Sequence, residues 1–152
     1  MQVCNVSFVI VISLLMLSAC SSFAQQDSVG EAGMHHHLKQ WQTMRLQDYD
    51  LLYQKHCYCL PDHLRSIRVE IRNGEVAQAL FVDTNSPVVK DIQLETISTF
   101  FELIDQAQKK SAYKIEVDYD SAYGYPKSID IDYHQRMVDD EIAFSNIKVV
   151  KK

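Results

Sequence analysis

The feature that most constrains the fold is an Asn-Gly pair, Asn73-Gly74, placed between two segments in which apolar and polar residues alternate. Both residues tolerate positive φ, which a two-residue turn between antiparallel strands requires. Three aliphatic residues alternate with charged residues over 67–72, and a second strand-like segment follows over 75–82. The pattern predicts a β-hairpin in which Arg72 faces Glu75 and one face is buried.

Strand-like alternation recurs over 49–59, 113–120, 128–134 and about 141–149, which predicts further strands. Two other segments, one over 36–47 and one that follows Thr96, space their apolar residues three and four apart, as an amphipathic helix does. Thr96 suits the position of a helix N-cap. We therefore predict an α+β domain of order α-β-β-β-α-β-β-β. An antiparallel sheet of about six strands would carry two helices on one face. Its other face would be exposed to solvent or bound to a partner.

The N-terminal segment is set apart by an apolar stretch over 8–17, which is too short to cross a bilayer and is typical of a signal peptide. Leu17-Ser18-Ala19-Cys20 resembles the lipobox of bacterial lipoproteins, in which the Cys becomes the lipidated first residue. We therefore predict a lipoprotein signal peptide over 1–19, a tether over 20–35 and a single domain over 36–152. The alternative is an ordinary signal peptide over 1–24, which would release a soluble secreted chain.

Two cysteines, Cys57 and Cys59, fall within the predicted domain. An exported compartment is oxidising, so two free thiols would be unusual there. Residues two apart on a flat strand have Cα atoms about 6.5–7 Å apart, at the upper limit for a disulfide. We predict an intramolecular disulfide that locks a bend at the end of the first strand. Two buried reduced thiols, or a metal or redox role, are the alternatives.

The second predicted hairpin has an acidic face. In the expected register Glu116 lies opposite Asp130, and Asp120 lies opposite Pro126. Like charges directly opposite each other destabilise a sheet by a few tenths to about 1 kcal/mol. Such a cost suggests that the carboxylates bind a cation, bind a basic partner or keep the protein soluble. The simpler interpretation is that they form a solvated sheet face without a specific role.

Asp118-x-Asp120 with Gly124 loosely resembles a calcium loop, but its fifth position is Ala122 and the closing position is Ile129, so two ligands are missing. We therefore assign no metal ligand. Tyrosines of the turn are a second group of candidates, because Tyr side chains are common binding anchors. The candidate binding residues are Tyr123, Tyr125, Glu116, Asp118, Asp120, Asp130 and Asp132.

Several landmarks occur in a characteristic order. The most specific is Tyr-Asp-x-x-Tyr-Gly-Tyr-Pro over 119–126, followed by Ile-x-Ile-Asp over 129–132. They follow Trp41, Tyr49, Tyr53, Cys57-Tyr58-Cys59, Asn73-Gly74 and Phe100. This order resembles a family of small bacterial exported proteins and lipoproteins known only as a domain of unknown function, and the resemblance runs from about Trp41 to the C-terminus. It implies location and fold class, but no catalytic residue, because the family has no assigned activity.

The composition argues against general nucleic-acid binding, since 15 Lys and Arg against 20 Asp and Glu give a net charge of -5. No lipase-type serine motif, phosphate loop or dinucleotide fingerprint is present. We expect a non-enzymatic interaction domain without a cofactor. Through a lipid on Cys20 it would be anchored in the outer membrane, facing the periplasm and an envelope protein or cell-wall partner. A calcium-binding module is the alternative function, and an unrecognised enzyme comes third.

Overall fold

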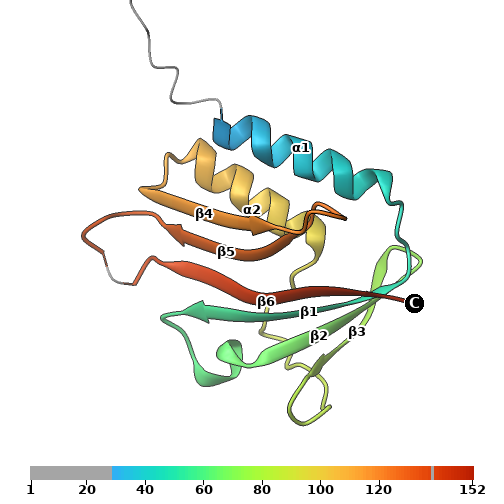
Figure 1. Cartoon of the computed structure of the whole chain (residues 1–152). Helices are drawn as coiled ribbons and strands as arrows, with labels where there is room; N and C mark the ends of the chain where they lie inside the picture. The colour runs from blue at the N-terminus through green and yellow to red at the C-terminus, as the bar shows by residue number, and fades with distance from the viewer. Residues whose placement is uncertain (1–28, 138) are drawn as a thin grey trace, which may run out of the picture.

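The structure is a computed structural model that describes residues 29–137 and 139–152 (Figure 1). Cys20, the predicted signal peptide and the first part of the predicted tether lie outside the described residues. A short 3-10 helix, η1 (Pro61–Leu64), precedes the second strand. In the described residues the remaining elements follow the predicted order: α1 (Val29–Thr43), β1 (Tyr49–Cys57), β2 (Ser66–Arg72), β3 (Glu75–Phe81), α2 (Ile97–Lys109), β4 (Lys114–Tyr119), β5 (Pro126–Asp132) and β6 (Ile142–Lys151).

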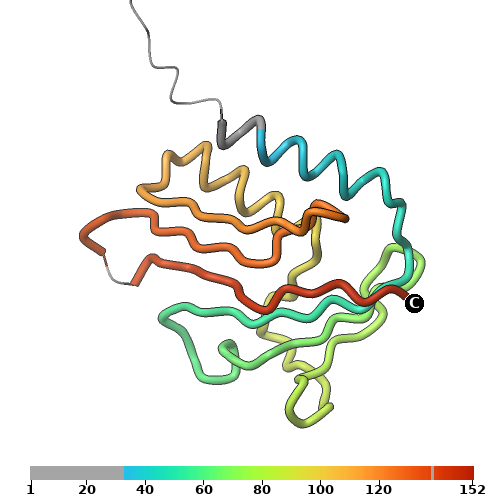
Figure 2. Tube along the Cα trace, viewed as in Figure 1, coloured from blue at the N-terminus to red at the C-terminus, as the bar shows by residue number. Residues whose placement is uncertain are grey.

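The strands form one antiparallel sheet with the spatial order β3-β2-β1-β6-β5-β4 (Figures 1 and 2). The first and last strands, β1 and β6, lie side by side in the middle, so both halves of the chain share one sheet. Both helices pack on the same face, which confirms the predicted α+β architecture. The core between this face and the helices includes Met34, Leu51, Tyr53, Ile67, Val69, Ile97, Phe100, Ile104, Ile129 and Ile131.

The hairpin between β2 and β3 forms as predicted. Asn73 and Gly74 have φ values of 53° and 79°, and Arg72 pairs with Glu75. Positive φ at both turn residues matches the right-handed twist of the strands. The turn is also tied to the loop before β1, because the backbone N–H of Gly74 donates to the carbonyl oxygen of Gln47 at 2.9 Å.

The start of α1 differs from the prediction. The helix begins at Val29, so residues 29–35, which were predicted to belong to the tether, are helical. The reason is Met34, which is only 2% exposed in the core. Met34 lies four residues before Leu38 and seven before Trp41, so it extends the apolar stripe of the helix by one turn.

α2 begins after Thr96, the predicted N-cap, and Thr99 makes the cap reciprocal. The side-chain oxygen of Thr96 accepts a hydrogen bond from the backbone N–H of Thr99 at 3.2 Å. The side-chain oxygen of Thr99 accepts one from the backbone N–H of Thr96 at 2.7 Å. Two donors at the helix terminus are thereby satisfied.

A β-bulge in β6 was not predicted. The pairing of β1 with β6 shifts between Leu52 and Gln54, and Asn146 on β6 has a φ of 56°. The extra residue brings Phe144 and Ile147 to the same buried face although they are three residues apart.

Candidate binding face

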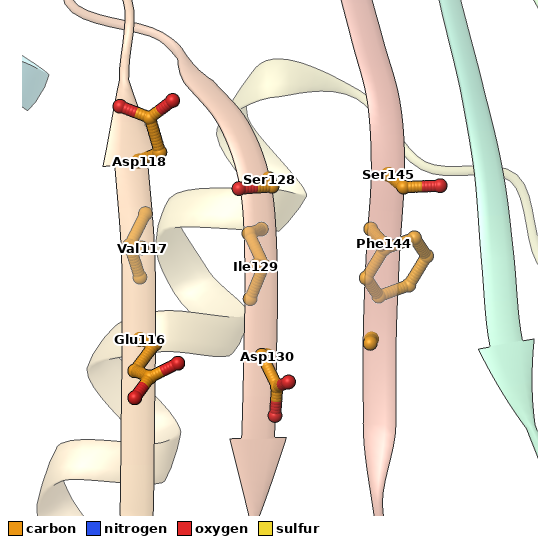
Figure 3. Close-up of a pocket in the computed structure, with 9 residues that line it drawn as sticks. Glu116, Val117, Asp118, Ser128, Ile129, Asp130, Phe144 and Ser145 are labelled. Atoms are coloured by element: carbon orange, nitrogen blue, oxygen red, sulfur yellow. The ribbon is translucent and has the colours of Figure 1, made fainter.

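The face of the sheet opposite to the helices is here called the open face. A hollow of about 430 Å³ lies on it over β4, β5 and β6 (Figure 3). Side chains alternate along a strand, so apolar residues such as Ile129 and Phe144 point into the core while their neighbours point outward. The polar residues that line the hollow are Glu116, Asp118, Ser128, Asp130 and Ser145.

The predicted register of the second hairpin is confirmed along its length except next to the turn. Glu116 pairs with Asp130 as expected. Near the turn the pairing shifts, so that Pro126 lies opposite Tyr119 and not opposite Asp120. This bulge leaves Asp120 to pair through its backbone N–H with the carbonyl oxygen of Tyr125 at 2.8 Å.

Two lysines lie among the carboxylates of the hollow. Lys114 Nζ is 3.1 Å from a Glu116 carboxylate oxygen and 3.6 Å from one of Asp130. Lys127 Nζ is 3.0 Å from a carboxylate oxygen of Asp118. The pKa of Lys114 is raised, mainly by its hydrogen bond to Glu116. The pKa of Lys127 is raised in the same way, mainly by its hydrogen bond to Asp118. The hollow is therefore a mixed charge network and not a bare acidic cluster.

The other two acidic candidates have local structural roles. An Asp120 carboxylate oxygen accepts hydrogen bonds from the backbone N–H groups of Ala122 and Tyr123 at 2.9 and 2.8 Å. Asp132 accepts one from the backbone N–H of His134 at 3.0 Å. Both residues stabilise the turns that follow them. Within the described residues no three His, Cys, Asp or Glu side chains are grouped as a metal site.

The two tyrosine candidates are not equivalent. Tyr125 is only 6% exposed and its ring packs edge-on to Trp41 at 6.0 Å between centroids, so it is a core residue and offers no contact surface. The bulge next to the turn places it under α1, which residue counting along ideal strands does not anticipate. Tyr123 is half-buried, and Lys151 Nζ lies 4.3 Å from its ring centroid.

The Tyr-Asp-x-x-Tyr-Gly-Tyr-Pro segment packs against α1. The His37 ring stacks on Tyr119 with centroids 4.0 Å apart, and Gln40 donates through Nε2 to the carbonyl oxygen of Ser121 at 2.8 Å. Burial raises the pKa of Tyr119 to about 12. Gly124, whose φ is 80°, comes so close to the helix that an added Cβ would lie 2.5 Å from the His37 carbonyl oxygen. The segment therefore has a structural role in holding α1.

The Cys57–Cys59 disulfide is present, as predicted, with Cα atoms 5.4 Å apart. The separation is shorter than in a flat strand because β1 ends at Cys57 and the chain turns there. The backbone N–H of Cys59 donates to the carbonyl oxygen of Cys57 at 3.0 Å. Two neighbours that the sequence analysis did not single out, Tyr58 and Leu60, are 88% and 66% exposed.

The other half of the open face carries an ion-pair network that the sequence analysis missed. Asp50 is 7% exposed, and its two carboxylate oxygens contact Arg72 at 2.8 Å and Lys152 at 2.9 Å. Arg72 also lies 3.3 Å from Glu70. Burial alone would raise the pKa of Asp50, but hydrogen bonds and charge from Lys152 and Arg72 outweigh it and lower the pKa. A lone acidic residue in a strand gave no sequence signal for these long-range partners.

The N-terminal candidate, Cys20, lies outside the described residues. Among the residues that the structure does describe, no helix has the length and apolar character needed to span a membrane.

Comparison with known proteins identifies a family. Residues 34–151 match the Family of unknown function (DUF6174), which covers well over half of the chain. No curated protein and no solved structure matches. This match covers nearly the same residues as the resemblance found in the sequence, which runs from about Trp41 to the C-terminus. In both cases the family has no assigned activity. The chain therefore belongs to the DUF6174 family.

Proposed function

We propose that the protein is an exported cell-envelope protein, anchored through a lipid on Cys20, whose domain binds a basic segment of an envelope partner with its open face. The apolar stretch over 8–17 and the sequence Leu17-Ser18-Ala19-Cys20 support export and anchoring. The chain from Cys20 to the start of α1 at Val29 can span at most about 30 Å when fully extended. A lipid on Cys20 would therefore hold the domain close to the membrane surface.

The observation that carries the binding proposal is the set of carboxylates around the hollow, Glu116, Asp118 and Asp130. Among the described residues, Lys114 and Lys127 form the ion pairs with these three carboxylates, so one negative charge is left in excess. The two lysine side chains are 40% and 45% exposed, so an incoming Lys or Arg can replace them without disturbing the core. Charge complementarity of this kind steers a basic partner toward the face and fixes its orientation.

Site-specific photo-crosslinking tests the proposal. A photoreactive residue placed at Ser128, inside the hollow, is compared with one at Ser98, an exposed residue of α2. In intact envelopes we expect adducts with a defined protein from position 128 and none from position 98. The adducts should disappear when Glu116 and Asp130 are both changed to Lys. Equal adducts from both positions, or adducts that survive the double charge reversal, would refute a basic partner on this face.

A carboxylate-to-amide variant, Glu116→Gln, tests the calcium alternative. If the carboxylates are ligands, calcium should raise the melting temperature of the unmodified protein and leave that of Glu116→Gln unchanged. The binding proposal expects no calcium-dependent shift in either protein.

A further inference from the structure

The end of β1 forms an exposed tip next to the open face, and the open-face proposal does not use its disulfide or its exposed apolar side chains. The disulfide between Cys57, the last residue of β1, and Cys59 closes a loop around the single residue Tyr58. Cys57 is half-buried at the end of the strand, where it pairs with Ile142 of β6, whereas Cys59 is exposed. Tyr58 and Leu60, the neighbours of Cys59 in the chain, are the two most exposed large apolar side chains of the described residues.

We propose that the Cys57–Cys59 disulfide is a thiol–disulfide exchange site for cysteine-containing polypeptides. The loop that this disulfide closes is very short. A disulfide stabilises a fold largely by restricting the unfolded chain, and this restriction grows with the number of residues enclosed. A bond between residues only two apart therefore contributes little to folding and can be reduced while the domain stays folded.

The two sulfur atoms of the disulfide differ in their accessibility. Exchange requires a thiolate to approach one sulfur atom in line with the bond, so exposed disulfides are the labile ones. Cys59 is exposed and Cys57 is held in the β1–β6 ladder. Attack therefore takes place at Cys59 Sγ, and Cys57 is the leaving group.

The chemistry balances without a further reagent. A substrate thiolate forms a bond to Cys59 Sγ, the Cys57–Cys59 bond breaks, and Cys57 leaves as a thiolate that takes a proton from water. A second substrate thiolate then attacks the substrate sulfur of the mixed disulfide and releases Cys59, which is protonated in turn. The substrate dithiol is oxidised to a disulfide, and the Cys57–Cys59 pair is reduced to a dithiol by the same two electrons. One protein molecule oxidises one substrate dithiol.

The surface around the disulfide combines apolar and polar side chains. A hollow of about 270 Å³ beside the tip is lined by Cys57, Tyr58, Ile142 and Ala143 and also by His56, Asp130 and Glu141. The apolar part of the tip is completed by the exposed side chain of Leu60. Tyr58 and Leu60 can contact apolar residues on either side of a substrate cysteine, as in an unfolded or extended polypeptide. The closed loop holds Tyr58 in place before binding, which reduces the entropy lost on association.

The test uses the oxidised, folded protein and two synthetic dithiol peptides, one with apolar residues and one with Ser and Gly around its cysteines. Acid quenching, alkylation and mass spectrometry measure the rate at which Cys57 and Cys59 become reduced. We expect complete reduction under conditions in which circular dichroism shows the domain still folded, and faster reaction with the apolar peptide. Changing Tyr58 and Leu60 to Ser should lower the rate of disulfide reduction by the apolar peptide about tenfold. The rate of reduction by dithiothreitol should not change. Val82→Ser, which alters another exposed apolar residue, is the matched control.

Single-cysteine variants identify the attacked sulfur. Cys57→Ser leaves the exposed Cys59, which should form a mixed disulfide with an oxidised peptide faster than Cys57 does in Cys59→Ser. The proposal is overturned if the disulfide is reduced only where the domain unfolds, or if both peptides react at equal rates with the unmodified protein. These measurements need no partner of the open face. The proposed exchange site and the proposed binding of a basic partner can therefore fail independently of each other.

Discussion

Replacing Gly124 by Ala tests whether the turn between β4 and β5 holds α1 in place. Gly124 has a φ of 80°, and a Cβ there would lie 2.5 Å from the His37 carbonyl oxygen and 2.9 Å from Gln40 Cβ. A left-handed backbone costs a non-glycine residue about 1–2 kcal/mol. Forcing a methyl group against a helix backbone that cannot yield adds about 1–3 kcal/mol. We therefore expect Gly124→Ala to lower the free energy of unfolding by about 2–5 kcal/mol.

Two other glycines separate these contributions. At Gly74, where φ is 79°, an added Cβ would meet only Gln47 Oε1, at 2.7 Å, the end of a flexible side chain that can turn away. Gly74→Ala should therefore cost only the backbone contribution, about 1–2 kcal/mol. At Gly33, within α1, nothing lies within 4 Å of the added Cβ. Gly33→Ala should stabilise the protein by about 0.5–1 kcal/mol, because Ala favours the helix.

Urea unfolding measures all three variants. The single tryptophan, Trp41, packs against Tyr125 beside the turn and reports the loss of this contact by fluorescence, while circular dichroism follows the whole fold. The midpoints should shift without a change in slope. If Gly124→Ala costs no more than Gly74→Ala, the close approach to α1 does not contribute to stability and the reasoning fails.

Thr96→Ala removes half of the reciprocal cap of α2 and should cost about 1 kcal/mol in urea unfolding, whereas Thr96→Ser should cost far less. Asp50→Asn should destabilise by about 1–3 kcal/mol at neutral pH. Because Lys152 and Arg72 outweigh the effect of burial and lower the pKa of Asp50 in the folded state, its contribution is present above the ordinary carboxyl pKa and is lost as the pH falls through the lower folded-state pKa. A deficit that does not shrink in acid would contradict this assignment. Cys20→Ser should move the protein from the membrane to the soluble fraction, and a wild-type mature N-terminus at Gln25 would exclude lipidation at Cys20.

The parts of the fold that the sequence predicted are those governed by local chemistry. Asn73-Gly74 gives its turn because both residues adopt positive φ, and Thr96 caps α2 because its hydroxyl oxygen accepts a hydrogen bond from the backbone N–H of Thr99, three positions along the chain. The spatial order of the strands was not predicted, although within each half consecutive strands lie next to each other, which is the commonest arrangement. The disulfide was predictable because only two cysteines, two positions apart, fall in the domain.

The failures lie where distant segments decide the outcome. The start of α1 depends on Met34 reaching the core, and the burial of Tyr125 depends on Trp41 from that helix. The bulge at Asn146 has no marker such as glycine, although it decides which residues of β6 face the core. Exposure of Tyr58 and Leu60 follows from the turn that ends β1 at Cys57, whereas the alternation predicted a strand that continues through Cys59.

The acidic hairpin shows how a correct register can still give an incomplete electrostatic picture. Glu116 does face Asp130, but Lys114 lies diagonal to Asp130 and reaches both carboxylates. Diagonal neighbours are about 7–8 Å apart, within the reach of a lysine side chain. Comparing only directly opposite residues overlooks such a contact and overstates the repulsion. A basic partner gains affinity on this face only if its charges bind the carboxylates better than Lys114 and Lys127 already do, which favours the planar, bidentate guanidinium of arginine over the ammonium of lysine.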